Sequence, residues 1–314
     1  MKKLAFVFPG QGSQKLNMGL DFFENFNLAK QIIEQTSDIV NIDILNVVKD
    51  EQSLKDAVNT QVALFAVSIA ILECLKKEKP LLSVDFYLGH SLGEYTALVA
   101  SDVLNFKDCL LLIKKRAELM KECTQKVEGS MAAVVGVERD FIESLVENTK
   151  INNEILVCAN YNSKVQTVVS GEVQAVVRLV QKAKEQGVKA VLLPVAGAFH
   201  SPLMEFANIQ LQKYIENTNF NKPKTTFISS QNTEIVSNEN IIKENLKNQI
   251  ISKVDWVGAV NTAIKNKVTH FVEIGSGQVL CGLIAKIDEF VHSKPMNDIS
   301  SFENFLSDKL FDNN

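Results

Sequence analysis

One short segment restricts the fold more than any other part of this chain of 314 residues. An apolar stretch ends at Leu88, residues 89–93 read G-H-S-L-G, and an apolar helical pattern continues to Leu98. A G-x-S-x-G sequence between a strand and a helix is typical of a nucleophile elbow, a sharp turn that presents its serine at the edge of a sheet. We therefore predict that Ser91 is a nucleophile with the N-terminus of a helix behind it. The alternative is an ordinary loop whose serine only caps the helix.

The segment before the elbow predicts an α/β fold with parallel strand pairing. Residues 4–8 form a fully apolar strand, and residues 10–14, with the sequence G-Q-G-S-Q, end it. A buried strand followed by a glycine-rich turn indicates a central parallel strand with a functional loop at its carboxyl end, although a plain turn is equally compatible with the pattern. Residues 17–77 have helical patterns, so strands and helices alternate up to the elbow.

The middle of the chain predicts an inserted subdomain. Its expected elements are strand 131–137, helix 140–148, strands 155–159 and 166–170, helix 172–186 and strand 188–193. This β-α-β-β-α-β order is the ferredoxin-like split motif. We expect a large domain of residues 1–127 and 196–314, and a small subdomain of residues 128–195.

The C-terminal part shows weaker patterns. It is expected to contain a strand at 225–228, helices across 241–265, a strand at 270–274 and a final helix. From about Val291 the sequence is polar and weakly patterned, so we expect a surface appendage there.

Arg116 is unusual because it lies on the apolar face of a predicted helix over residues 105–123. At 100° per residue it shares that face with Ile113 and Met120, whereas Lys114 and Lys115 point away. A buried guanidinium is unfavourable unless an anion pairs with it. The partner is either an internal carboxylate in a structural ion pair or the carboxylate of a substrate, which the planar guanidinium can bind with two hydrogen bonds.

The candidate general base follows from the four histidines. His90 adjoins Ser91, but adjacent side chains on a sharp turn diverge. His270 falls in an apolar strand and His292 in the polar tail. His200 lies in a glycine-containing loop at the end of the insertion, where catalytic groups are commonly carried, and is our candidate base. No aspartate is placed unambiguously to complete a triad.

Composition excludes several classes of protein. The 33 basic and 37 acidic residues are nearly balanced, which gives no indication of nucleic-acid binding. Five scattered cysteines without a C-x-x-C pattern argue against a disulfide framework or a zinc site and favour a reducing compartment. The apolar run before Pro9 is too short for a signal peptide, and the run 62–75 too short and interrupted for a membrane span. We expect a soluble, cytoplasmic protein with no membrane partner.

Several motifs together resemble the malonyl-CoA:acyl carrier protein transacylase family in order and spacing. They are residues 10–14 (G-Q-G-S-Q), 89–94 (G-H-S-L-G-E), 160–163 (N-Y-N-S), 197–202 (G-A-F-H-S-P) and 273–277 (E-I-G-S-G), with Gln249 seven residues before Trp256. The resemblance covers the chain except its tail.

This resemblance implies an α/β-hydrolase-like core with an inserted ferredoxin-like subdomain and the active site between them. It implies that Ser91 accepts the acyl group, that His200 is its base, and that a main-chain carbonyl at Gln249 orients the histidine. The backbone N–H groups of Gln11 and Leu92 would form the oxyanion hole, and Arg116 would hold the malonyl carboxylate.

The implied partners are malonyl-CoA and acyl carrier protein, with no cofactor and no metal, for fatty acid synthesis. Nothing in the chain demands a dimer, and we expect a monomer. Three alternatives stay open at this point: a serine hydrolase with the same elbow, an inactive scaffold subunit, and the same chemistry in a polyketide pathway.

Overall fold

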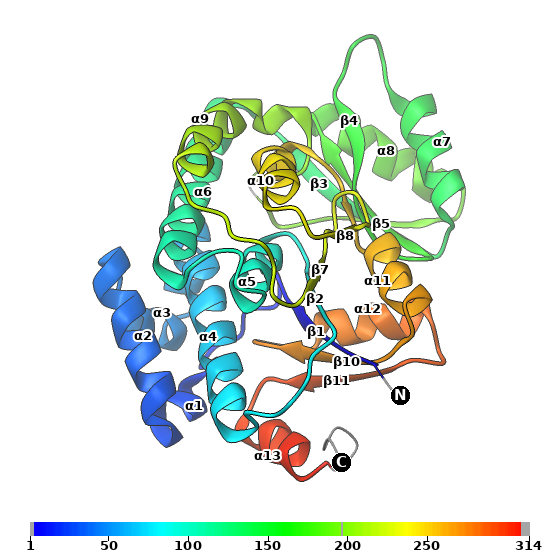
Figure 1. Ribbon diagram of the computed structural model, residues 1–314. Coiled ribbons are helices and arrows are strands. Elements are labelled where there is room, and N and C mark those ends of the chain that lie inside the picture. The colour runs from blue at the N-terminus through cyan, green and yellow to red at the C-terminus, as the bar shows by residue number, and fades with distance from the viewer. Residues whose placement is uncertain (1–2, 196, 309–314) are drawn as a thin grey trace.

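The computed structural model describes residues 3–195 and 197–308. Its main element is a sheet whose strands lie in the order β11 (His292–Met296), β10 (Val268–Ile274), β1 (Lys3–Phe8), β2 (Phe86–Gly89), β7 (Thr226–Ile228) and β8 (Ile235–Val236). All neighbours pair in parallel except β7 and β8, which are antiparallel (Figure 1). The expected parallel α/β core is confirmed.

Helices cover both faces of this sheet. The first face packs against a large group, namely α1 (Leu20–Asn25), α2 (Asn27–Val40), α3 (Ile44–Lys49), α4 (Ala57–Glu78), α5 (Leu92–Ala100), α6 (Phe106–Lys126), α9 (Glu205–Glu216), α10 (Glu239–Asn248) and α13 (Ile299–Ser307). The second face packs against α11 (Trp256–Lys265) and α12 (Val279–Ile287). Strand β1 supplies both cores, because its side chains alternate: Phe6 and Phe8 enter the first core and Val7 enters the second.

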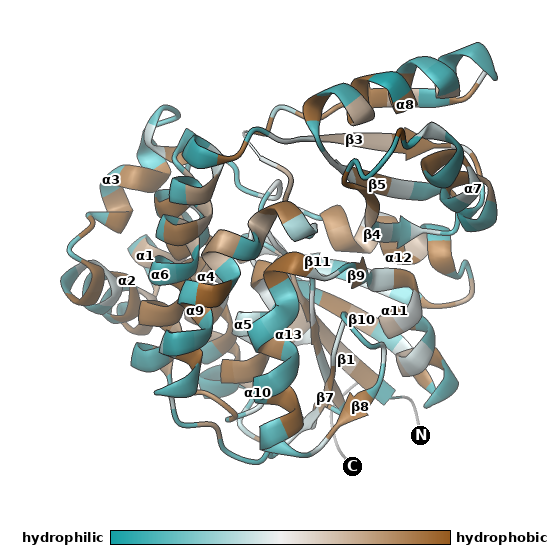
Figure 2. Ribbon diagram, turned by 90° about the horizontal axis from the view of Figure 1, so that it is seen from above, coloured by the Kyte–Doolittle hydropathy of each residue, from teal (hydrophilic) through white to brown (hydrophobic). Residues whose placement is uncertain are grey.

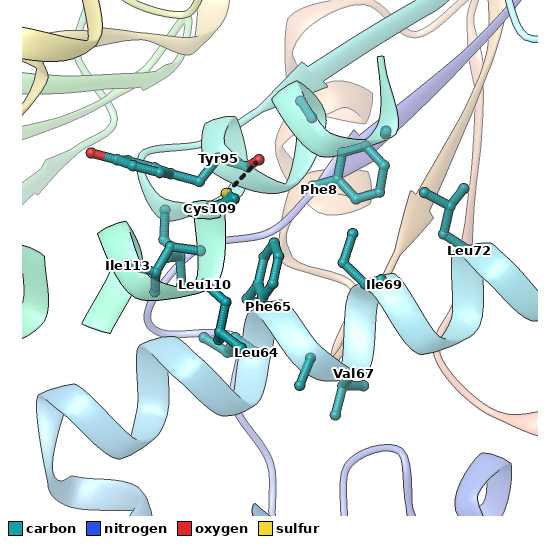
Figure 3. Packing of buried hydrophobic residues seen from close by; sticks show 14 of the residues in the cluster. Phe8, Leu64, Phe65, Val67, Ile69, Leu72, Tyr95, Cys109, Leu110 and Ile113 are labelled. Carbon is teal, nitrogen blue, oxygen red and sulfur yellow. Dashed lines mark hydrogen bonds between the residues drawn. The ribbon is translucent and has the colours of Figure 1, made fainter. Parts of the chain in front are cut away.

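Helix α4 is the centre of the first core. Figure 3 shows its Phe65 and Ile69 beside Phe8 of β1, with Tyr95 of α5 and Cys109 of α6 on the other side. Within the described part of the chain it is the one helix long and apolar enough to cross a membrane, but 83% of that window is buried inside the protein. Its hydrophobicity on all sides therefore reflects its position in the core.

The middle of the chain forms a unit with the expected β-α-β-β-α-β order of elements. It consists of β3 (Ser130–Val135), α7 (Arg139–Thr149), β4 (Leu156–Ser163), β5 (Gln166–Gly171), α8 (Val173–Glu185) and β6 (Lys189–Leu192). Helices and strands share a separate apolar core, and Figure 2 shows hydrophobic residues on the side of α8 that faces β3. The strand order β6-β3-β5-β4 is extended by a fifth strand, β9 (Val254–Asp255), which pairs in parallel with β4.

Strand β9 was not expected from the sequence. The expected helices across residues 241–265 are present as α10 and α11, but a 3₁₀ turn at Gln249–Ile251 and then β9 lie between them. The small sheet is completed by a strand from beyond residue 195, so the two parts share backbone hydrogen bonds. The expected division at residues 128 and 196 stays a prediction, and residue 196 lies outside the described ranges.

The expectation of a surface appendage after Val291 is wrong. Residues 292–296 form β11, which pairs in parallel with β10. Helix α13 then packs Phe302, fully buried, and Phe305 into the first core. The polar sequence of β11 is explained by its position at the sheet edge, where side chains reach solvent. Residues 309–314 of the expected tail lie outside the described ranges.

Candidate active site

Ser91 lies on a strained turn between β2 and α5. Its φ is 51° and its ψ is −107°, a conformation that non-glycine residues rarely adopt. Both flanking positions must be glycine because a side chain there would clash with the backbone. A Cβ on Gly93 would lie 1.9 Å from the carbonyl oxygen of Phe8, and a Cβ on Gly89 would lie 2.0 Å from the carbonyl carbon of Gly93. The expected nucleophile elbow is therefore present in its full geometry, with β1 packed against it.

His200 reaches Ser91 from the loop that follows the inserted subdomain. Its Nε2 lies 2.8 Å from Ser91 Oγ, and its Nδ1 lies 3.1 Å from the carbonyl oxygen of Gln249 and 3.0 Å from that of Ser252. Carbonyl oxygens only accept hydrogen bonds, so Nδ1 carries the proton and Nε2 is free to accept the proton of Ser91. Among the described residues, no aspartate or glutamate bonds to His200, which explains why no triad acid could be assigned.

His200 is held in its neutral form. It is 5% exposed and has a φ of 57°. Burial, the nearby charge of Arg116 and the neighbouring His90 lower its pKa to about 3. At neutral pH the imidazole is thus available as a proton acceptor.

Arg116 of α6 points into the same site and is 1% exposed. Its Nη1 donates to Gln61 Oε1 at 2.6 Å, and its Nη2 donates to Ser91 Oγ at 3.0 Å and to Gln249 Oε1 at 3.3 Å. The guanidinium also lies 5.6 Å from the centre of the Tyr95 ring, and its Nε has no hydrogen-bond partner in the described structure. None of the described hydrogen-bond partners of Arg116 is a carboxylate. Of the two alternatives from the sequence, the direct structural ion pair is absent from the described residues.

Two residues that line the cavity carry backbone N–H groups without an acceptor among the described residues. The N–H of Leu92 is the first of α5, directly after Ser91, and the N–H of Gln11 belongs to the loop after β1. Within the described residues, neither donates a hydrogen bond to another protein atom. Orphan N–H groups at a helix N-terminus are suited to stabilise an oxyanion.

These groups line one cavity of about 350 Å³. The elbow and the loop after β1 lie at the edge of the large sheet, and Arg116 of α6 and His200 from the loop after β6 lie beside them. The small sheet contributes Met131, Asn160, Asn162 and Val168 from its strands, and Leu193 from the segment after β6. Asn162 also binds His90, Nε2 to Oδ1 at 2.9 Å, so the elbow and the small sheet are joined beside the nucleophile. The site therefore lies between the two sheets, as expected.

Three residues that complete the site were not predicted from the sequence. Gln61 binds Arg116 from the buried helix α4, Ser252 shares the Nδ1–H of His200, and Glu94 binds the side chain of Gln249. For Gln61 a signal existed, since it is a polar residue directly before the mainly apolar run 62–75. For Glu94 the signal was an acid on a helix that is apolar on all sides.

A serine on a nucleophile elbow, a neutral histidine at hydrogen-bond distance and two unpaired N–H groups define an α/β enzyme of acyl transfer. A family comparison agrees with this class: residues 5–298 match the acyl transferase domain family.

More specific relatives were found by sequence and by structure. The chain is 38% identical over 294 residues to the malonyl CoA-acyl carrier protein transacylase of Staphylococcus aureus strain COL, covering 93% of this chain and 94% of that one. It superimposes with a TM-score of 0.92 on the malonyl CoA-acyl carrier protein transacylase of Coxiella burnetii, at 32% identity and 97% coverage of each chain. A malonyl-transacylase in complex with a type II PKS acyl-carrier protein gives a TM-score of 0.92, 31% identity and full coverage of both chains.

This chain belongs to the malonyl CoA-acyl carrier protein transacylase family. It is an acyltransferase, and the family that the motifs suggested is confirmed.

Proposed function

We propose that this enzyme transfers the malonyl group from malonyl-CoA to the phosphopantetheine thiol of acyl carrier protein through a malonyl-Ser91 intermediate, and so supplies fatty acid synthesis. The proposal rests mainly on the position of Arg116. This buried cation has no carboxylate partner among the described residues, and its Nη2 lies 3.0 Å from Ser91 Oγ. A substrate that places a carboxylate next to a reactive carbonyl matches this arrangement.

In the first half-reaction, Ser91 Oγ attacks the thioester carbonyl while its proton passes to Nε2 of His200. The negative charge on the carbonyl oxygen is stabilised by the N–H groups of Gln11 and Leu92. Loss of one such donor typically costs about 10²- to 10³-fold in rate. The tetrahedral intermediate then collapses, the C–S bond breaks, and the proton on Nε2 goes to the coenzyme A thiolate. The product is the malonyl ester of Ser91.

In the second half-reaction, His200 accepts the proton of the pantetheine thiol, and the thiolate attacks the ester carbonyl. Collapse breaks the bond to Ser91 Oγ, which regains the proton from Nε2. Since both half-reactions use the same groups, the chemistry needs no cofactor.

Arg116 supplies selectivity in this proposal. The malonyl carboxylate replaces Ser91 Oγ as the acceptor of its Nη2–H bond and can also reach the unpartnered Nε–H, which gives the two-pronged geometry of an arginine–carboxylate pair. A substrate without this carboxylate leaves a desolvated guanidinium unpaired, which is strongly unfavourable.

Incubation of the protein with malonyl-CoA is expected to add one malonyl group to Ser91, detected by mass spectrometry of the intact chain and its peptides. Holo-acyl carrier protein, added afterwards, should remove the group and become malonylated. The Ser91→Ala variant is the control and should stay unmodified. An inactive scaffold would give no adduct on the folded wild-type protein, and a serine hydrolase would release free malonate before the carrier protein is added.

The acid side of the pH profile offers a separate test of His200 as the base. An unperturbed histidine loses its neutral form as pH falls through about 6.5, whereas a histidine with its pKa lowered to about 3 stays neutral. We expect kcat/KM for malonyl-CoA, which reports the free enzyme, to be nearly constant from pH 8 to pH 5. An acid limb with a midpoint near pH 6.5 would contradict the lowered pKa of His200, and its role as the base is tested separately by the His200→Ala variant. In the Arg116→Ala variant, assayed with acetyl-CoA, His200 no longer faces the positive charge of Arg116. The pKa of His200, and with it the midpoint of the acid limb, should therefore rise.

We extend the proposal to the organisation of the protein. Residues 1–127 and 196–314 form the large domain, residues 128–195 form the small one, and the enzyme acts as a cytoplasmic monomer. Five free cysteines, four of them buried, support a reducing compartment. The same chemistry could serve a polyketide pathway, since one structural relative was solved with a polyketide carrier protein.

A further inference from the structure

The catalytic steps give no role to Glu94, a buried acid close to the nucleophile. Glu94 lies three residues after Ser91 in the first turn of α5 and is 4% exposed. An acid in a first helical turn is often present only to interact with the helix dipole. The contacts of Glu94 point to a more specific function.

The described partners of the Glu94 carboxylate all donate hydrogen bonds to it. Gln249 Nε2 lies 2.5 Å from Oε2, Ser229 Oγ lies 3.0 Å from Oε1, and the backbone N–H of Ser230 also bonds to the carboxylate. The pKa of Glu94 is raised because burial outweighs the opposing effects of these hydrogen bonds and of the charge of Arg116. A carboxyl surrounded by donors and close to a cation is suited to the ionised form.

Glu94 determines how the side chain of Gln249 is oriented. The amide Nε2 donates both to Glu94 and to the carbonyl oxygen of Ser91, at 3.0 Å, so Oε1 must point the other way, where it accepts the hydrogen bond from Arg116. A flipped amide would place its oxygen against two acceptors. The main-chain carbonyl of the same Gln249 binds Nδ1 of His200. One residue thus contacts the elbow, the base and the cation, and Glu94 holds it.

We propose that Glu94 is a positioning residue, which orients Arg116 for the malonyl carboxylate through the side-chain amide of Gln249. Its carboxylate also balances the guanidinium charge, although the Gln249 amide lies between the two groups. The proposal rests on the proposed malonyl transfer and assigns the specificity of that site to one further residue.

The distance of the acid from the cation is what makes this arrangement useful. A carboxylate in direct contact with Arg116 would compete with the substrate for the guanidinium. Glu94 instead bonds to an amide whose oxygen bonds to the guanidinium, so charge is balanced while the Nη2–H and Nε–H groups stay available. Removal of the charge should therefore weaken malonyl selection and not merely lower overall activity.

The variant Glu94→Gln tests the proposal, because it keeps the size of the side chain but turns an amide toward the amide of Gln249. We expect kcat/KM for malonyl-CoA to fall tenfold or more, and the malonyl-to-acetyl ratio of kcat/KM to fall with it, because acetyl-CoA does not use Arg116. General damage to the fold would lower kcat/KM equally for both substrates and leave their ratio unchanged. A wild-type ratio in Glu94→Gln would overturn the proposal.

Two further variants separate positioning from anchoring. Ser229→Ala removes another hydrogen bond of Glu94 without affecting Gln249, and should keep the wild-type malonyl-to-acetyl ratio. If the ratio fell as far as in Glu94→Gln, Glu94 would only anchor the end of β7. Gln249→Ala keeps the main-chain carbonyl and should lower the ratio, with little further loss when combined with Glu94→Gln. If Glu94→Gln does not fold, an unchanged ratio in Gln249→Ala overturns the proposal by itself. Failure of the wild-type protein to form the Ser91 adduct would instead reject the proposed function.

Discussion

Replacement of His200 by alanine is expected to slow malonylation of Ser91 by about 10²- to 10⁴-fold, the range over which positioned general bases contribute. The variant loses the acceptor 2.8 Å from Ser91 Oγ, and His90, the other histidine among the described residues that line the cavity, is bound to Asn162. Rapid-quench measurement of coenzyme A release in a single turnover would give the acylation rate directly. Some activity should remain, because the N–H groups of Gln11 and Leu92 still stabilise the oxyanion.

A matched control for this variant is His292→Ala. His292 is an exposed histidine on β11, remote from the cavity lining, so its loss should leave the acylation rate within about twofold of wild type. Thermal unfolding of both variants should be compared, because His200 adopts a positive φ that alanine tolerates less well. A drop of less than tenfold in folded His200→Ala would reject this residue as the base.

Much of the site could be predicted because its signals are local. The G-x-S-x-G spacing identifies Ser91, and helical periodicity places Arg116 on a buried face. The chain has only four histidines, and setting three of them aside leaves His200 as the base. What could not be predicted depends on contacts between distant segments. Gln249 reaches Glu94 across 155 positions and Arg116 across 133. No spacing rule relates such residues, so their network became visible only in the folded chain.

The missed elements of the fold have a similar explanation. Strand β9 has two residues, too few for any alternation, and exists because β4 offers an edge. Strand β11 is polar because it lies at the sheet edge, so it lacks the apolar pattern of a central strand. Helix α13 did carry a usable signal: Phe302 and Phe305 are three positions apart, and Asp298 caps the helix in a capping box.

The Arg116→Ala variant should show the largest change in specificity. The malonyl carboxylate loses the guanidinium that binds it. Removal of one member of a buried charge pair usually costs about 2–5 kcal/mol, so kcat/KM for malonyl-CoA should fall by about 30- to 4000-fold. Acetyl-CoA should be used as well as before or better, because it no longer desolvates an unpaired guanidinium. The measurement is kcat/KM for both substrates, with formation of each acyl adduct on Ser91 confirmed by mass spectrometry.

The ratio between the substrates makes this prediction decisive. Arg116 also donates to Ser91 Oγ, so its loss can alter the nucleophile itself, but that effect is common to both substrates and cancels in the ratio. Lys115→Ala removes a positive charge from the same helix on its outer side, where Lys115 pairs with Glu118, and should leave the ratio unchanged. Arg116→Lys keeps the charge but not the planar two-pronged donor, and should recover only part of the preference. If Arg116→Ala still preferred malonyl-CoA as strongly as wild type, the carboxylate would have to bind elsewhere in the cavity, and the roles of both Arg116 and Glu94 would be rejected together.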